Sequence, residues 1–231
     1  MNPPSSPHRP IRSFVRREGR ITKAQERALT ELWPRYGVDA GDAPLDLCAL
    51  FGRKAPVHVE IGFGNGDVLA AMAARHPEYD YLGIEVHRPG IGALLRRLEA
   101  AGLGNARVMR ADAEEVLARN IPDAALSAVY IFFPDPWPKK RHHKRRLIQP
   151  EFAELVRRKL QPGGMLHLAT DWRDYAEQML DVLSQTPGFE NTAAAGAFAP
   201  RPEERPLTKF EQRGKRLGHE VYDLSFRRSQ R

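Results

Sequence analysis

Short apolar runs alternate with stretches of helical periodicity from residue 57 onward, and this alternation constrains the fold more than any other feature. The runs lie at residues 57–61, 81–86, 106–109, 128–133 and 165–169. Between them, apolar residues recur every three or four positions, as on one face of a helix. Strands that alternate with helices predict an α/β fold with a mostly parallel sheet and helices on both faces. Ligands of such sheets bind at the carboxyl ends of the strands.

The two ends of the chain differ from this central pattern. Residues 1–21 are rich in Pro, Ser and Arg, and we predict a flexible basic arm there, followed by a single domain over residues 22–231. Gly163 and Gly164 are expected to end the helix that precedes them. The alternating residues 220–226 predict a closing strand at an edge of the sheet.

The composition of the chain indicates which kind of partner it binds and in which compartment it works. Thirty-six Lys and Arg against 29 Asp and Glu give a net charge of +7, which favours a polyanionic partner. The longest apolar run, residues 68–74, is far shorter than the roughly 20 residues that cross a bilayer, so no membrane segment is expected. The N-terminus lacks the apolar stretch of a secretory signal, which predicts a cytoplasmic protein. The lone Cys48 agrees with a reducing compartment and is expected in the core.

A glycine-rich turn follows the first of these strands. Glu60 is succeeded by Gly62, Gly64 and Gly66, and glycine lets the backbone pass close to a ligand. The dinucleotide fingerprint would need a glycine at position 67, where the chain has Asp67, so an NAD-linked oxidoreductase is disfavoured. An acid followed by G-x-G-x-G is the turn that S-adenosylmethionine enzymes use. The ligand is therefore expected to carry a positive charge.

Two further acids stand at the ends of the next two strands. Glu85 is placed to accept hydrogen bonds from ribose hydroxyls, and Asp112 to accept one from an adenine amino group. A single acid at such a position is more often a helix cap or a solvated residue. Acids on three successive strand ends make an adenosine-containing cofactor the better interpretation.

The fourth strand leads into a proline-rich loop and then a basic block. Pro134, Asp135, Pro136, Trp137 and Pro138 predict a rigid loop, because proline fixes φ and removes a donor. Residues 139–146 read KKRHHKRR. A stiff turn alone does not account for a carboxylate, an aromatic ring and a run of cations in succession, whereas a nucleic-acid active site needs all three. Cations beside the histidine pair oppose a metal ion, so no metal site is expected.

Six motifs in order resemble the bacterial tRNA (guanine-N(7)-)-methyltransferase family over about residues 57–228. They are Glu60–Gly66, Gly83–His87, Phe132–Trp137, His143–Arg146, Ala169–Trp172 and Thr208–Glu211. The resemblance implies a Rossmann-like S-adenosylmethionine-dependent methyltransferase fold. It also implies methylation of guanine N7 in tRNA, at guanosine 46 of the variable loop.

The resemblance also implies roles for individual residues. The expected cofactor-binding residues are Glu60, Gly62, Gly64, Gly66, Glu85, Asp112 and Asp135. Asp135 is also the expected catalytic acid. Residues expected to hold the target nucleotide are Lys139, Asp171, Thr208, Lys209, Phe210 and Glu211. Those expected to contact the tRNA are Arg141, His142, His143, Lys144, Arg145 and Arg146.

Two other interpretations stay open beside this one. Asp135-Pro136-Trp137 is similar to the motif of enzymes that methylate exocyclic amines, where the acid would accept an amino hydrogen. An RNA-binding module that keeps the fold without catalysis is the second, although the glycine turn is intact. Guanine N7 has a lone pair and no proton, so alignment matters more than a general base, and Asp135 is expected to hold the guanine edge or the cofactor amine. The sequence predicts no oligomeric state.

Overall fold

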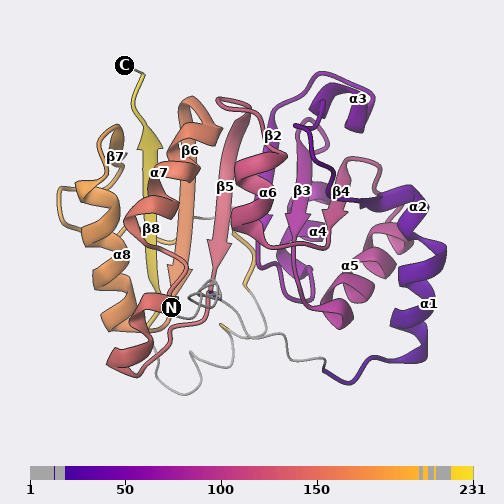
Figure 1. Ribbon diagram of the computed structural model, residues 1–231, viewed down its shortest axis with the longest axis horizontal. Coiled ribbons are helices and arrows are strands. Elements are labelled where there is room, and N and C mark those ends of the chain that lie inside the picture. The colour runs from indigo at the N-terminus through magenta and orange to yellow at the C-terminus, as the bar shows by residue number, and fades with distance from the viewer. Residues whose placement is uncertain (1–12, 14–18, 203–204, 208–210, 212–219, 231) are drawn as a thin grey trace, which may run out of the picture.

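The computed structural model describes residues 13, 19–202, 205–207, 211 and 220–230 (Figure 1). The helices there are α1 (Lys23–Glu31), α2 (Trp33–Tyr36), α3 (Leu47–Phe51), α4 (Asp67–Arg75), α5 (Arg88–Ala100), α6 (Ala113–Arg119), α7 (Pro150–Lys159) and α8 (Arg173–Gln185), with a 3-10 helix η1 (Lys140–Arg145). The strands are β1 (Gly37–Val38), β2 (Val57–Ile61), β3 (Asp80–Ile84), β4 (Ala106–Met109), β5 (Leu126–Phe132), β6 (Leu160–Thr170), β7 (Phe189–Asn191) and β8 (Tyr222–Arg228).

These strands form one mixed sheet in the order β1-β4-β3-β2-β5-β6-β8-β7. The pairs from β1 to β6 are parallel, and β8 is antiparallel to both β6 and β7. In Figure 1 the parallel strands point downward and β8 points upward. The strand order reverses between β2 and β5, so the place for a ligand is the carboxyl edge around these two strands.

Two apolar cores cover opposite faces of the sheet. One joins the strands to α6, α7 and α8, and the other joins them to α4, α5 and the N-terminal helices. Along β2, Val57, Val59 and Ile61 belong to the first core, so the pleat turns His58 and Glu60 toward the opposite face. The mostly parallel sheet with helices on both faces confirms the predicted α/β architecture. Within the described ranges, no helix combines the length and apolar character that a bilayer crossing requires.

The five predicted strands are present, and their ends shift by two residues or fewer except at β6, which begins at Leu160 instead of residue 165. Two other predictions about elements are wrong. Gly163 and Gly164 lie inside β6 instead of ending α7, which stops at Lys159. Gly163 has φ +80°, and the pairing of β6 with β5 shifts register near its start. The two glycines therefore allow the irregular backbone at the start of β6. The strand near the C-terminus is interior, because β7 pairs with β8 and takes the edge.

Cys48 is also placed differently from the prediction. It lies in α3 and is exposed, although free cysteine is more often buried. The five-residue helix α3 has no fully buried side chain, because its Leu47, Leu50 and Phe51 only partly cover the first core from outside.

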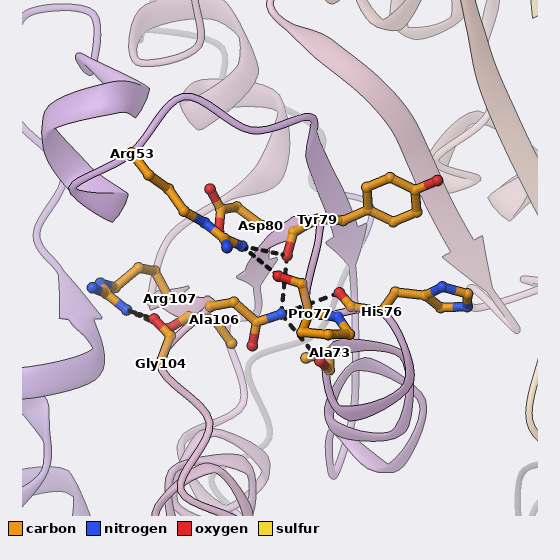
Figure 2. Close-up of polar contacts among 10 residues, drawn as sticks. Arg53, Ala73, His76, Pro77, Tyr79, Asp80, Gly104, Ala106 and Arg107 are labelled. Atoms are coloured by element: carbon orange, nitrogen blue, oxygen red, sulfur yellow. Dashed lines mark hydrogen bonds and ion pairs between the residues drawn. The ribbon is translucent and has the colours of Figure 1, made fainter.

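Side chains of Arg53 and Asn105 form a network of hydrogen bonds with the loops at the amino end of β3 (Figure 2). Arg53 Nε and one terminal nitrogen donate to Asp80 Oδ1 at 3.0 and 2.7 Å, and Asp80 is 1% exposed. Asn105 Nδ2 donates to the carbonyls of Ala73 and Tyr79 at 3.0 and 2.9 Å. These bonds satisfy backbone groups where α4 ends and β3 begins.

Histidines and tyrosines stack on the sheet face that carries Glu60. The ring of His58 lies 4.5 Å from that of Tyr79, and its Nδ1 is 3.1 Å from the Tyr130 hydroxyl. Tyr130 in turn stacks on His167 at 5.6 Å. Desolvation lowers the pKa of both histidines to about 4, so both are neutral at pH 7.

Candidate active site

The glycine turn joins β2 to α4 at the carboxyl edge of the sheet. Gly62, Gly64 and Gly66 have φ of +71°, +57° and +73°, a region that other residues rarely adopt. A Cβ added to Gly62 or Gly64 would enter open space, whereas one at Gly66 would lie 2.6 Å from Leu94. The first two glycines therefore leave room for a ligand, and the third allows α4 to pack against α5.

Glu60 is buried beneath this turn, at the end of β2. It is 4% exposed, and its Oε2 has no hydrogen-bond partner among the described residues. Desolvation, followed by the charges of Glu85 and Asp67, raises the pKa of Glu60 to about 8. An unsatisfied buried carboxyl that resists ionisation, beneath a turn that leaves room for a ligand, is suited to a cationic group.

Glu85 and Asp112 stand at the ends of the next two strands, and both line a cavity of about 570 Å³. Glu85 Oε1 accepts from the N–H groups of Val86 and His87 at 2.7 and 3.0 Å, and its Oε2 accepts from Gly64 at 2.9 Å. Asp112 is the N-cap of α6 and accepts from the Glu114 amide at 3.0 Å. Both carboxylates are therefore oriented by the backbone, and Glu85 also ties the glycine turn to β3.

The proline-rich loop forms another wall of the same cavity, together with Gly62. Phe133 and Trp137, which bracket Asp135, have φ of +54° and +45°. Such values are rare outside glycine and persist only where surrounding contacts hold them. The Phe133 amide donates to Ala169 O at 2.7 Å, and Asp135 is exposed. The structure therefore brings Asp135 to the cavity that Glu85 and Asp112 line.

The basic block forms η1, and its side chains have different environments. Arg141 and Lys144 are exposed, while His142, His143 and Arg145 are half-buried. The guanidinium of Arg145 lies 4.7 Å from the Trp137 ring centroid. The pKa of His142 is lowered by desolvation and then by neighbouring cations, so the ring is neutral at pH 7.

Arg146 is buried, unlike the other cations of the block. Its guanidinium donates to Pro136 O, Gln178 Oε1 and Asp174 Oδ2 at 2.8, 2.6 and 2.5 Å. The predicted tRNA contact by Arg146 does not fit this placement. Burial of this one arginine is decided by α8, which is distant in sequence.

The residues predicted to hold the target nucleotide are only partly brought together. Lys139 is exposed at the start of η1, and Asp171 directly follows β6, which pairs with β5. Thr208, Lys209 and Phe210 lie outside the described residues. Glu211 is buried, with its carboxylate 2.7 and 3.2 Å from two Arg205 nitrogens, so a direct contact to a base does not fit its placement.

The structure adds residues that the sequence reasoning missed. Arg205 also pairs with Asp223 of β8 at 3.0 Å, and its guanidinium lies 5.6 Å from the Phe132 ring. At the N-terminus, Ser13 and Gly19 line the cavity, and the Trp137 indole donates to Ser13 O at 3.0 Å. No sequence signal marks these contacts, because each joins segments that lie far apart along the chain. In the described part of the chain, no group of three metal-binding side chains is found.

The donor set fits S-adenosylmethionine. The orphaned Glu60 oxygen matches a cationic amino-acid portion, and the open space over Gly62 and Gly64 admits a ligand close to the backbone. Asp67, in the first turn of α4, is paired with Arg97 at 2.7 Å, so a carboxylate occupies the place where a dinucleotide pyrophosphate would bind. The site therefore suits a cation better than a phosphate.

Comparison with known proteins agrees with this geometry. A family model described as "Putative methyltransferase" matches residues 54–224. A tRNA (guanine-N(7)-)-methyltransferase of Alkalilimnicola ehrlichii is 64% identical over 222 residues, which cover 95% of this chain and 93% of that protein. One from Nitrosococcus oceani is 60% identical over 221 residues, covering 96% and 92%.

Solved structures share the fold at much lower identity. The 16S rRNA methyltransferase KamB superposes with a TM-score of 0.56 at 15% identity, covering 93% of this chain and 97% of that one. A 30S ribosomal A1408 methyltransferase from an uncultured bacterium gives 0.55 at 12% identity, covering 79% and 92%. Fold and site together define a methyltransferase that uses S-adenosylmethionine. On the level of sequence, the chain belongs to the tRNA (guanine-N(7)-)-methyltransferase family.

Proposed function

We propose that this protein methylates N7 of a guanosine in tRNA, at position 46 of the variable loop, and that it acts in the cytoplasm. The family assignment supports the reaction, and the position follows from the resemblance of the motifs. The observation that carries the proposal is the meeting of three features at one edge of the sheet. These are the oriented acids around the cavity, the strained loop with Asp135, and the exposed cations of η1.

The cofactor shell consists of Glu60, Glu85 and Asp112 with the glycine turn. Glu60 binds the ammonium of the amino-acid portion, and Glu85 and Asp112 accept from the ribose and the adenine. The cofactor supplies an electrophilic methyl group on a sulfonium. The backbone bonds that fix Glu85 and Asp112 orient the cofactor before the nucleotide arrives, which reduces the entropy lost on reaching the reactive geometry.

Asp135 holds the guanine edge or the cofactor amine in the aligned geometry. Because N7 carries a lone pair and no proton, no proton has to be removed from it before methyl transfer. A carboxylate on a rigid loop instead positions a donor group of the base and supports the positive charge that develops on the purine. Lys139 and Asp171, which flank the loop, contribute to holding the nucleotide.

The exposed cations of η1 bind the phosphate backbone. Arg141 and Lys144 are exposed on successive turns of η1, which follows the loop, and Arg145 stacks on Trp137. Such contacts fix the register of the RNA but carry no sequence information. Replacing Arg141 and Lys144 by Glu should weaken tRNA binding and lower the salt slope of log K by about 1 to 2. Arg75→Glu with Arg119→Glu, two exposed arginines elsewhere, is the matched control.

The decisive experiment is transfer of labelled methyl from S-adenosylmethionine to unmodified tRNA, with the product nucleoside identified. Asp135→Asn tests the carboxylate, and Asp42→Asn, an exposed acid outside the cavity, is the control. N7-methylguanosine made by the parent and lost in Asp135→Asn supports the reaction and the site. Methylation of an exocyclic amine would favour the alternative target, and tight tRNA binding without transfer would indicate a binding module. Full turnover by Asp135→Asn would remove the need for its charge.

A further inference from the structure

Arg146 is the member of the basic block that faces inward. Its side chain is 1% exposed, and each of its three nitrogens donates to a protein acceptor. Its guanidinium also lies 4.8 Å from the Tyr175 ring centroid. A guanidinium that neutralises a phosphate needs its planar fork free and exposed. The fork of Arg146 is used entirely within the protein.

One arm of this fork holds the proline-rich loop that carries Asp135. Nε donates to the carbonyl of Pro136, the residue between Asp135 and Trp137. On either side of it, Phe133 and Trp137 keep positive φ values that relax unless other contacts hold them. The bond to Pro136 therefore acts on the centre of the segment that carries Asp135.

The other arms of the fork reach α8. Gln178 Oε1 and Asp174 Oδ2 accept from the two terminal nitrogens, and Gln178 Nε2 donates onward to Ile148 O at 3.2 Å. Tyr175, Ala176 and Met179 of α8 are buried against the sheet, so the helix is a fixed support. Arg146 thus connects the loop to α8 and, through α8, to the core.

We propose that Arg146 is a positioning residue that fixes the loop of Asp135 through Pro136, and not a ligand of tRNA phosphate. The inference rests on the proposed role of Asp135 in the active site. It assigns a catalytic effect to Gln178 as well, which lies on α8 and is connected to the loop through Arg146.

Two substitutions of Arg146 separate a brace from a phosphate contact. Arg146→Lys keeps the charge but loses the fork, and Arg146→Gln loses both. For a brace, both variants lower kcat by about 10- to 100-fold, as misplacement by an ångström does, while the salt slope of tRNA binding stays at the parent value. For a phosphate contact, Arg146→Lys stays close to the parent, and Arg146→Gln reduces the slope by about 1.

Gln178→Ala tests the brace without removing a buried charge. We expect it to lower kcat by about 3- to 10-fold with an unchanged tRNA dissociation constant, because it loosens only one arm of the fork. Its effect should not add to that of Arg146→Gln, since both break the same connection. Gln185→Ala is the matched control, as Gln185 lies on the same helix and donates to Asp181. Equal kcat values for Gln178→Ala and the parent would overturn the proposal.

Amide exchange of residues 133–145 gives a readout that does not depend on turnover. The bonds from Phe133 N to Ala169 O and from His142 N to Lys139 O protect this segment in the parent. Faster exchange there in Arg146→Lys and Gln178→Ala, with the core amides unchanged, supports the brace. If Asp135→Asn kept full activity, the catalytic role of Asp135 would fail while this exchange result still decided the brace. Unchanged exchange in both variants would refute it.

Discussion

Binding of S-adenosylmethionine should release a proton from Glu60. Burial and two nearby carboxylates raise the pKa of Glu60 from 4.5 to about 8. That shift corresponds to about 5 kcal/mol for ionising the side chain in the free protein. At pH 7 about nine in ten molecules therefore carry a protonated Glu60. A cationic amine against the orphaned Oε2 favours the carboxylate, so binding and deprotonation are linked.

The size of the pH effect on cofactor binding follows from this linkage between binding and deprotonation of Glu60. Between pH 6 and 7 the cofactor amine stays protonated while Glu60 has to lose its proton, so the dissociation constant should fall by about tenfold. Calorimetry in buffers of different ionisation enthalpy should count about 0.9 proton released at pH 7. Glu60→Gln should bind more weakly at pH 8 and show little dependence on pH. The same pH dependence in Glu60→Gln and in the parent would show that cofactor binding is not linked to the proton of Glu60.

The stability of the free protein should depend on the ionisation of Glu60. Because the folded state holds the proton of Glu60 more tightly than the unfolded state, the contribution to stability is complete below pH 4.5 and is lost as pH rises through about 8. Glu60→Gln should therefore gain stability relative to the parent between pH 6 and 9. Urea unfolding at pH 6 and at pH 9 measures the difference, and Glu190→Gln, which changes an exposed acid on β7, is the control.

Three further perturbations have defined outcomes. The pKa values of His58 and His167 are near 4, so the protein should lose up to about 3 kcal/mol of stability for each histidine as pH falls from 6.5 to 4. Urea unfolding of His58→Gln should show a shallower loss of stability than the parent. Arg53→Ala leaves Asp80 buried without its cation and should lower the free energy of unfolding by about 2 kcal/mol, less than for a fully buried pair because Arg53 is 42% exposed. Gly64→Val, at φ +57° and facing the ligand space, should abolish cofactor binding in calorimetry while tRNA affinity in a filter assay stays within about twofold.

The local sequence determined the elements and the part of the site that depends on local order. Short apolar runs and the period-3.6 patterns between them predicted the parallel strands and their helices, because these patterns reflect which side chains face a core. Acids and glycines that directly follow strands reach one edge of a parallel sheet, so Glu60, Glu85, Asp112 and Asp135 were predicted at one site. The structure places the last three on the cavity and Glu60 beneath the glycine turn.

Tertiary structure decided the roles that depend on burial. Arg146 and Lys144 are both basic residues of one short run, and only the packing of α8 makes the first a buried brace and leaves the second exposed. Glu211 is likewise enclosed by Arg205, which in turn pairs with Asp223 on β8. The environment of a charged side chain is set by neighbours from distant segments, and desolvation then decides whether it binds a ligand or the protein itself.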